Sequence, residues 1–260
     1  MVKMPRSDEK LPRRDAIEFE VDIGPLSPPP SFLAQAQSFG LAFDAGDLER
    51  LGRYLALLLT ANEKLNLTGI READEAWIRH IFDSLTLLPM LGECAPGASV
   101  VDVGSGGGTP GIPLAIAQSA LAFTLVESTQ KKAEFLRAAV GALDVKNVTV
   151  VCARAETIGA EGGSHRERFD AAIARALGPL NVAAELVLPL IAPGGQALFI
   201  KGQKAANELV DARRAIHTLG GVHAGTVQTP TGRIVVLDKA KPSPRAYPRK
   251  PGVPKKEPIG

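Results

Sequence analysis

A glycine-rich turn in the middle of the chain is the first feature that could do chemistry. Residues 100–103 are apolar apart from Asp102 and predict a short buried strand. Gly104, Gly106 and Gly108 follow, and such glycines remove side chains where the backbone turns sharply or approaches a ligand. Pro113 then suits the first turn of a helix. A strand, a glycine turn and a helix in this order form a nucleotide cradle in α/β folds.

The spacing of the glycines narrows the class of nucleotide. The dinucleotide fingerprint G-x-G-x-x-G requires a third glycine at position 109, where this chain has Thr109. Residues 122–127 predict a second strand that ends in Glu127, whose carboxylate can accept hydrogen bonds from both hydroxyls of a ribose. Together these features resemble motif I and the acidic loop of class I S-adenosylmethionine-dependent methyltransferases. An NAD-dependent dehydrogenase and a glycine turn without a ligand stay open as alternatives.

The residues that are missing favour certain methyl acceptors. Enzymes that methylate exocyclic amines of nucleic acids commonly carry an Asn/Asp-Pro-Pro-aromatic motif after the fourth strand, where residues 174–179 read ARALGP. Enzymes that methylate carbon five of pyrimidines use a cysteine, usually after proline, but Cys94 follows a glutamate and Cys152 a valine. A ring nitrogen with a free lone pair, such as guanine N7, requires neither group. A small-metabolite acceptor fits the same absences and remains an alternative.

Alternating strands and helices must position these residues. Apolar side chains at helical spacing predict helices over 31–39, capped by Ser31, over 44–65, capped by Asp44, and over 74–90. Further helices are predicted at 129–143, 180–190 and 205–219, and 159–164 is predicted as a loop. The predicted strands are 99–103, 122–127, 148–153, 169–174, 196–201 (after a turn at 193–195), 222–228 and 233–238.

This order predicts an α/β fold of the class I methyltransferase type. Its Rossmann-like, mostly parallel seven-stranded sheet has an antiparallel edge hairpin, and an N-terminal helical subdomain packs on it. We expect a disordered or extended N-terminal extension at 1–30, a helical subdomain at 31–97, the methyltransferase core at 98–240 and a basic, proline-rich tail at 241–260.

Composition indicates an ordinary globular protein, with 45% hydrophobic and 22% charged residues. The sequence has neither an apolar run of membrane-spanning length nor a secretory signal, so we expect a cytoplasmic protein, with a monomer as the default. The two cysteines lack metal-ligand or redox spacing and are interpreted as small buried hydrophobic residues. The C-terminal cations either contact RNA phosphates or only aid solubility; they are Lys239, Lys241, Arg245, Arg249, Lys250, Lys255 and Lys256.

Seven short motifs in a fixed order give a closer resemblance. The chain from about Leu33 to its C-terminus resembles the bacterial 16S ribosomal RNA guanine-N7 methyltransferase family, also called glucose-inhibited division protein B. Gly107 stands where some members carry proline, and residues 1–30 fall outside the resemblance. The motifs are NLT at 66–68, RHIFDS at 79–84, DVGSGGGTPGIPL at 102–114, RAE at 154–156, ARA at 174–176, KG at 201–202 and YPRKPG at 247–252.

The resemblance implies S-adenosylmethionine as cofactor and a guanine of 16S rRNA as substrate, with the naked rRNA and the 30S subunit or its precursor as alternative forms of that substrate. It places Gly104 and Thr109 on the methionine and ribose side of the cofactor. It places Arg175 near the cofactor carboxylate or the incoming nucleotide. The remaining implied contacts are Glu127, Ser128 and Thr129 at the ribose and the border of the adenine, and Ala155 and Glu156 at the adenine.

No residue is assigned as a catalytic base or a metal ligand. His80, Asp83 and Ser84 lie at helical spacing on one face, and we expect this face to guide the guanine or its phosphate, although a purely structural His80 remains an alternative. Arg154 and Lys201 are further substrate-guiding candidates, with a solvated loop as the alternative for Lys201. We expect charge reversal at Lys201 or Arg249 to weaken RNA binding. A catalytically silent rRNA-binding factor is the nonenzymatic alternative.

Overall fold

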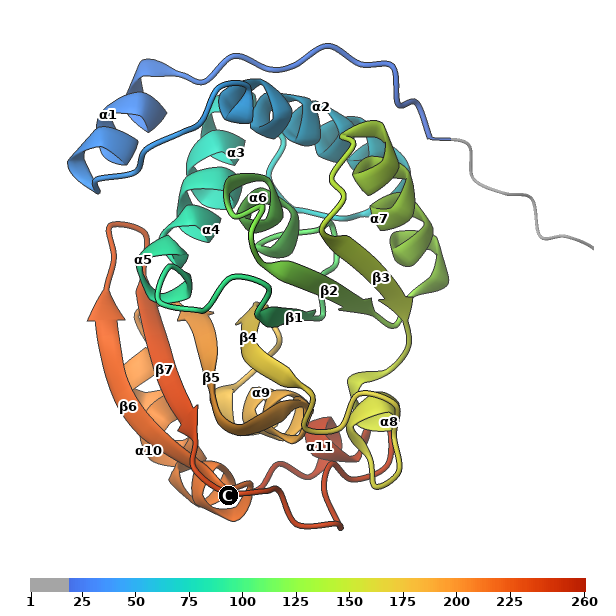
Figure 1. Ribbon diagram of the computed structural model, residues 1–260, viewed down its shortest axis with the longest axis vertical. Helices are drawn as coiled ribbons and strands as arrows, with labels where there is room; N and C mark the ends of the chain where they lie inside the picture. Colours follow the sequence, from blue (N-terminus) through green and yellow to red (C-terminus); the bar gives the residue numbers. More distant parts are fainter. Residues whose placement is uncertain (1–18) are drawn as a thin grey trace, which may run out of the picture.

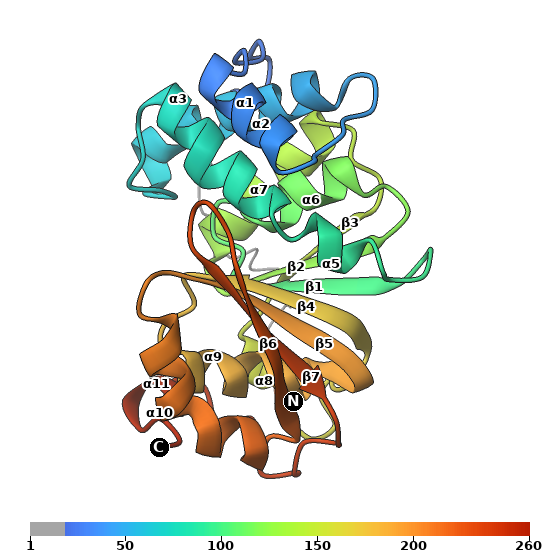
Figure 2. The same cartoon turned by 90° about the vertical axis from the view of Figure 1, so that its left-hand side faces the viewer.

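The structure, a computed structural model, describes residues 19–260 and consists of one sheet covered by helices on both faces (Figures 1 and 2). The sheet has seven strands in the order β3-β2-β1-β4-β5-β7-β6. The pairs among the first five of these strands are parallel, whereas β7 pairs antiparallel with β5 and β6. The strands are β1 (Ser99–Val103), β2 (Ala122–Glu127), β3 (Val148–Cys152), β4 (Phe169–Arg175), β5 (Ile191–Lys201), β6 (Gly221–Gln228) and β7 (Arg233–Lys239). The predicted fold class is confirmed.

The helices divide between the two faces of the sheet because strand side chains alternate in direction. Val100 and Ile173 pack into one hydrophobic cluster and Val101 and Ala172 into the other. The first cluster is covered by α1 (Pro30–Ser38), α2 (Asp47–Leu65), α3 (Ala73–Ala76), the π-helix η1 (Trp77–Phe82), α4 (Asp83–Leu85), α5 (Leu88–Leu91), α6 (Gly111–Ala117) and α7 (Gln130–Ala142). The second is covered by α8 (Ala155–Gly159), α9 (Leu180–Val187), the 3-10 helix η2 (Leu188–Leu190) and α10 (Ala205–Thr218), with α11 (Val253–Lys256) against α9.

The prediction of a single helix over 74–90 is wrong. The segment is α-helical only to Ala76, then π-helical as η1, and the helix ends after Leu85 before α5 begins at Leu88. Pro89 explains the restart, because proline lacks the N–H of a continuing helix and is tolerated only in the first turn. π-helical turns inside α-helices concentrate at functional sites, and η1 carries His80.

Several local boundaries also differ from the sequence expectations. Helix α1 begins at Pro30, before the predicted cap Ser31. Helix α2 begins at Asp47 after Gly46, and the Asp47 carboxylate accepts the N–H of Asp44, the residue predicted as cap. Strand β5 extends back to residue 191 through the predicted 193–195 turn. The short helix α8 was not predicted, and both free cysteines are half-buried rather than buried.

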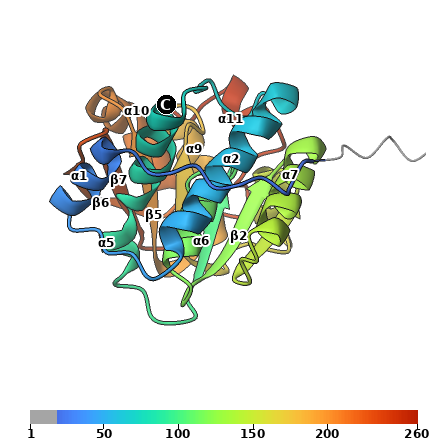
Figure 3. The ribbon, with the colours of Figure 1, turned by 90° about the horizontal axis from the view of Figure 1, so that it is seen from above.

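The N-terminal extension lies across helix α2 in the part that the structure describes (Figure 3). The Leu26 N–H donates to the Gly52 carbonyl at 3.2 Å, and Arg53 donates to the Val21 carbonyl at 3.2 Å. A Cβ on Gly52 would overlap the Leu26 carbonyl oxygen, so only glycine allows this approach. Residues 19–29 form neither helix nor strand, and residues 1–18 lie outside the described part.

The basic tail packs against the protein rather than extending into solvent. Lys239 is fully buried and donates to the Leu188 and Leu219 carbonyls, and this burial lowers its pKa to about 8. Arg249 pairs with the buried carboxylate of Glu185. The other five cations of the tail are exposed. No helix between residues 19 and 260 combines the length and the apolarity that a membrane crossing requires.

Candidate functional site

The glycine turn between β1 and α6 has the conformation that its sequence predicts. Gly104, Gly106 and Gly108 have φ values of 75°, 54° and 99°, which side-chain-bearing residues rarely adopt. A Cβ on Gly104 would lie 2.7 Å from the Cδ1 atom of Leu177. The turn therefore depends on glycine both for its backbone angles and for the close approach of Leu177.

The Asp102 carboxylate binds the backbone of the glycine-rich stretch. One carboxylate oxygen, Oδ2, accepts the Gly111 N–H at 3.1 Å. The other oxygen, Oδ1, is buried and has no hydrogen-bond partner within the described residues. Burial raises the pKa of Asp102 to about 7, although the nearby positive charge of Arg175 opposes the shift. A buried carboxylate with an unsatisfied oxygen is unusual in a core and points to a polar partner.

Tyr54 of α2 forms a hydrogen bond with the glycine turn that the sequence did not predict. Its hydroxyl, fully buried on α2, donates to the Gly107 carbonyl at 2.8 Å. Tyr54 lies in the apolar stripe of α2 at ordinary helical spacing, so its position in the sequence did not indicate this hydrogen bond. The N-terminal helices thus contact the glycine turn directly.

Glu127 closes the turn at the end of β2. Its Oε2 atom accepts the Gly106 N–H at 3.0 Å and its Oε1 atom accepts the Thr129 N–H at 2.7 Å. The carboxylate is thereby fixed at the carboxyl edge of the sheet, where ligands of α/β folds bind. Each carboxylate oxygen can accept a further hydrogen bond, so these contacts leave acceptor capacity for ribose hydroxyls.

A small cavity of about 70 Å³ lies beside this turn. Its walls combine the apolar side chains of Val103, Val126 and Leu177 with the polar groups of Ser128 and Glu156, a composition that suits a heterocycle with polar edges. Four of the eight predicted cofactor-binding residues line it: Gly104, Ser128, Ala155 and Glu156. Arg154 lines it too, with its guanidinium 3.3 Å from the Ser128 hydroxyl, so this predicted substrate-guiding residue lies on the cofactor side.

A second and larger cleft, of about 590 Å³, opens at the same edge of the sheet. It receives side chains from η1, from the end of β4, from the end of β5 and from the β6–β7 hairpin. Three predicted substrate-guiding residues line it, and Arg175 lines it as well; the three are His80, Asp83 and Lys201. Ser84 does not reach the cleft, because it is fully buried and donates to the His80 carbonyl at 2.5 Å.

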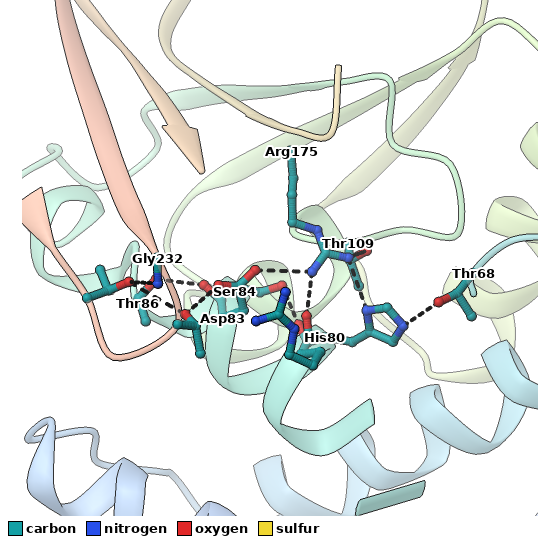
Figure 4. Close-up of polar contacts among 11 residues, drawn as sticks. Thr68, His80, Asp83, Ser84, Thr86, Thr109, Arg175 and Gly232 are labelled. Atoms are coloured by element: carbon teal, nitrogen blue, oxygen red, sulfur yellow. Dashed lines mark hydrogen bonds and ion pairs between the residues drawn. The ribbon is translucent and has the colours of Figure 1, made fainter. Parts of the chain in front are cut away.

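Arg175, which lines the cleft, is the centre of a polar network (Figure 4). Its Nη1 atom donates to the Arg79 carbonyl at 2.6 Å and lies 3.2 Å from Asp83 Oδ2. Its Nη2 atom donates to the Thr109 hydroxyl and to His80 Nδ1, the latter at 3.1 Å. The guanidinium therefore joins the glycine turn, through Thr109, to the helix that lines the cleft.

Two threonines complete the network, and sequence reasoning missed both contacts. Thr68 lies 2.7 Å from His80 Nε2, and Thr231, at the tip of the β6–β7 hairpin, donates to Asp83 Oδ1 at 2.5 Å. Burial and the adjacent guanidinium of Arg175 lower the pKa of His80 to about 4, so this imidazole is neutral at pH 7. Thr231 is separated from Asp83 by 148 positions, and no local pattern joins the two.

Lys201 is held in place rather than presented to solvent. Its ammonium donates to the Gly178 carbonyl at 2.6 Å and to Glu208 Oε2 at 2.8 Å, and only 9% of its side chain is exposed. It fixes the segment after β4, in which Ala176 has a left-handed φ of 54°. Ala176 and Gly178 line the cleft while Leu177 lines the cavity, so this short segment is the wall between them.

The matching family model is described as GidB: rRNA small subunit methyltransferase G, and it covers residues 47–234. A Sorangium cellulosum protein named ribosomal RNA small subunit methyltransferase G is 46% identical over 86% of this chain and 93% of its own length. The chain belongs to this family. A Lacticaseibacillus paracasei protein of the same name is 39% identical over 89% of this chain and 98% of its own.

Membership of the rRNA small subunit methyltransferase G family confirms the predicted resemblance and makes the protein an S-adenosylmethionine-dependent rRNA methyltransferase. A more distant likeness exists to the crystal structure of a mutant of MtNAS, at 18% identity and a TM-score of 0.50, covering 81% of this chain and 82% of that one. That likeness concerns the fold alone.

The residues present fit the cofactor of this family. Asp102 Oδ1 is buried and has no hydrogen-bond partner within residues 19–260, so it can accept a hydrogen bond near the glycine turn. Gly104 lines the cavity without a side chain, and Glu127, whose carboxylate accepts the Gly106 N–H, lies between the lining residues Val126 and Ser128. Apolar walls beside acceptors for hydroxyl and amine groups match a charged adenosyl donor.

Proposed function

We propose that this protein transfers the methyl group of S-adenosylmethionine to N7 of a specific guanine in 16S rRNA. The observation that carries the proposal is the single wall, residues 176–178, between the cavity beside the glycine turn and the larger cleft. A donor on one side and an acceptor on the other would meet beside Arg175. The family resemblance supplies 16S rRNA and guanine N7, and the width of the cleft supports a large substrate over a small metabolite.

We assign all eight predicted residues to the cofactor as the resemblance implies, including the four that do not line the cavity. Gly104 and Thr109 border its methionine and ribose side, Glu127 with Ser128 and Thr129 holds the ribose, and Ala155 with Glu156 meets the adenine. Arg175 stands at the end of the cofactor nearest the cleft. When bound, S-adenosylmethionine supplies a methyl group on a positively charged sulfur, ready for in-line displacement.

The chain's own residues then have to orient the guanine and exclude water. N7 of guanine carries a free lone pair, so its attack on a methyl group releases no proton to a base. The neutral His80, with its pKa near 4, and the paired Asp83 are therefore positioning groups in this proposal rather than proton acceptors. The cations at the cleft, Arg79 and Arg175, favour the polyanionic substrate.

The substrate is proposed to be the 30S subunit or its precursor, and the protein is proposed to act as a cytoplasmic monomer. The decisive experiment supplies labelled S-adenosylmethionine together with undermethylated 30S subunits, naked 16S rRNA or a metabolite extract, and maps the label. Label at N7 of one guanine supports the proposal, and the preferred RNA form identifies the substrate. Label on an adenine, on a metabolite or on no RNA overturns it.

A further inference from the structure

The C-terminal segment after β7 is anchored by a buried ion pair. The Arg249 guanidinium donates from Nε to Glu185 Oε1 at 2.8 Å and from Nη2 to Oε2 at 2.6 Å, and the Arg249 N–H donates to Oε1 at 2.9 Å. The Glu185 side chain, on α9, is 0% exposed. A fully buried carboxylate requires a charged, hydrogen-bonded partner, and Arg249 is that partner for Glu185.

A second carboxylate holds the same segment three residues later. Gly252, with a left-handed φ of 86°, donates its N–H to Glu156 Oε1 at 2.9 Å. Arg166 donates to the Tyr247 carbonyl at 2.6 Å and secures the segment on its other side. Residues 247–252 thus form a strap, called here the C-terminal strap, across helices α8 and α9.

The two helices that the strap joins are also walls of the proposed cofactor cavity. Glu156 and Ala155 of α8 and Leu186 of α9 line that cavity, and Leu186 follows Glu185 directly. Glu156 is 6% exposed and its Oε1 atom already accepts the strap, so its position in the cavity depends on Gly252. Within residues 19–260, the only charged group near its Oε2 atom is Arg154 Nε, 3.8 Å away. Oε2 can therefore still accept a hydrogen bond.

We propose that Arg249 is a positioning residue for the cofactor: it docks the C-terminal strap, and the strap holds Glu156 in the cavity where the adenine binds. This inference rests on the proposed function, because it takes the cavity to be the adenosyl site. It replaces the expectation that Arg249 contacts RNA, since both guanidinium contacts go to Glu185. The coupling is reciprocal, so an occupied cavity stabilises the docked strap.

The first experiment measures binding of S-adenosylhomocysteine by titration calorimetry in the absence of RNA. Arg249→Ala is expected to raise the Kd about tenfold, while Lys255→Ala, which removes an exposed cation of the same tail, leaves it unchanged. Because Arg249→Ala leaves Glu185 buried and unpaired, circular dichroism must show that the variant is folded at the assay temperature.

A second variant loosens the strap without unpairing a charge. A Cβ on Gly252 meets nothing within 4 Å, so Gly252→Ala only disfavours its left-handed backbone. The Kd for S-adenosylhomocysteine is expected to rise up to fivefold. Gly40→Ala, at an equally open left-handed glycine after α1, is the matched control and is expected to bind normally.

Limited proteolysis tests the reciprocal effect on the unaltered protein. Trypsin can cleave after the exposed Lys255 and Lys256, and S-adenosylhomocysteine is expected to slow this cleavage severalfold, but not in the Arg249→Ala variant. Equal Kd values for wild type and both strap variants, or equal cleavage with and without the nucleoside, overturn the inference. Either result leaves the proposed function standing, because rRNA methylation is measured separately.

Discussion

Arg175 Nη2 lies 3.1 Å from His80 Nδ1, and this contact fixes the state of the imidazole. A guanidinium has only N–H donors, so Nδ1 must be the unprotonated, accepting nitrogen. The proton is therefore on Nε2, which donates to the Thr68 hydroxyl at 2.7 Å. His80 is a neutral link between the NLT turn at 66–68 and the arginine at the end of β4.

The stability of the protein should fall in acid partly because of His80. Its pKa is about 4 in the folded protein against 6.5 in the unfolded chain, so the unfolded chain binds the proton first as the pH falls. Between pH 6.5 and 4 this linkage costs on the order of 3 kcal/mol of folding free energy. Urea unfolding at several pH values should show a correspondingly shallower acid loss for His80→Gln.

The control for this measurement is His217→Gln, which alters an exposed histidine on α10. It should keep the acid loss of the wild type. A His80→Gln profile that parallels the wild type from pH 7 to pH 4 would show that His80 is protonated as easily in the folded protein as in the unfolded chain. That outcome would contradict the assignment of Nδ1 as an unprotonated acceptor.

Arg175→Lys should lower the rate of rRNA methylation by about ten- to a hundredfold while the protein stays folded. A single ammonium cannot replace the fork that reaches Arg79, Asp83 and Thr109 together. Single-turnover kinetics on saturating rRNA measure the effect, with Arg213→Lys on the exposed face of α10 as the control. A wild-type rate for Arg175→Lys would mean that the network does not position the reactants.

Gly104→Ala should weaken S-adenosylhomocysteine binding at least tenfold. The alanine would carry a left-handed φ of 75°, at a cost of about 1–2 kcal/mol, and its Cβ would push Leu177 into the cavity. Gly69→Ala is the control, since that glycine has neither a left-handed φ nor an atom within 4 Å of the new Cβ. Calorimetry that gives the two variants equal Kd values would place the adenosyl site elsewhere.

Tyr54→Phe should destabilise the protein by about 1–3 kcal/mol, because it leaves the Gly107 carbonyl without its buried donor. The loosened glycine turn should also bind S-adenosylhomocysteine several times more weakly. Ser119→Ala, which removes an exposed hydroxyl in the turn before β2, serves as the control. Thermal denaturation and calorimetry measure the two effects, and a loss of stability without a loss of affinity would assign Tyr54 to packing alone.

The sequence by itself determined the features that depend on local physics. The left-handed glycines 104, 106 and 108 and the apolar strands before them follow from backbone sterics and from the alternation of side chains across a sheet. The place of Glu127 beside the glycine turn was also predictable, because parallel strands end at one edge of the sheet. The motifs also identified the family, which the family model and the relatives confirm.

Only the tertiary structure decided which polar groups pair. Arg249 belongs by composition to a basic tail, yet it neutralises Glu185, 64 positions earlier. Thr231 and Tyr54 have ordinary turn and core patterns, yet their hydroxyls reach Asp83 and Gly107. Periodicity tells only which side chains are buried, whereas the partner of a buried charge or hydroxyl depends on which distant segments the fold brings within about 3 Å of it.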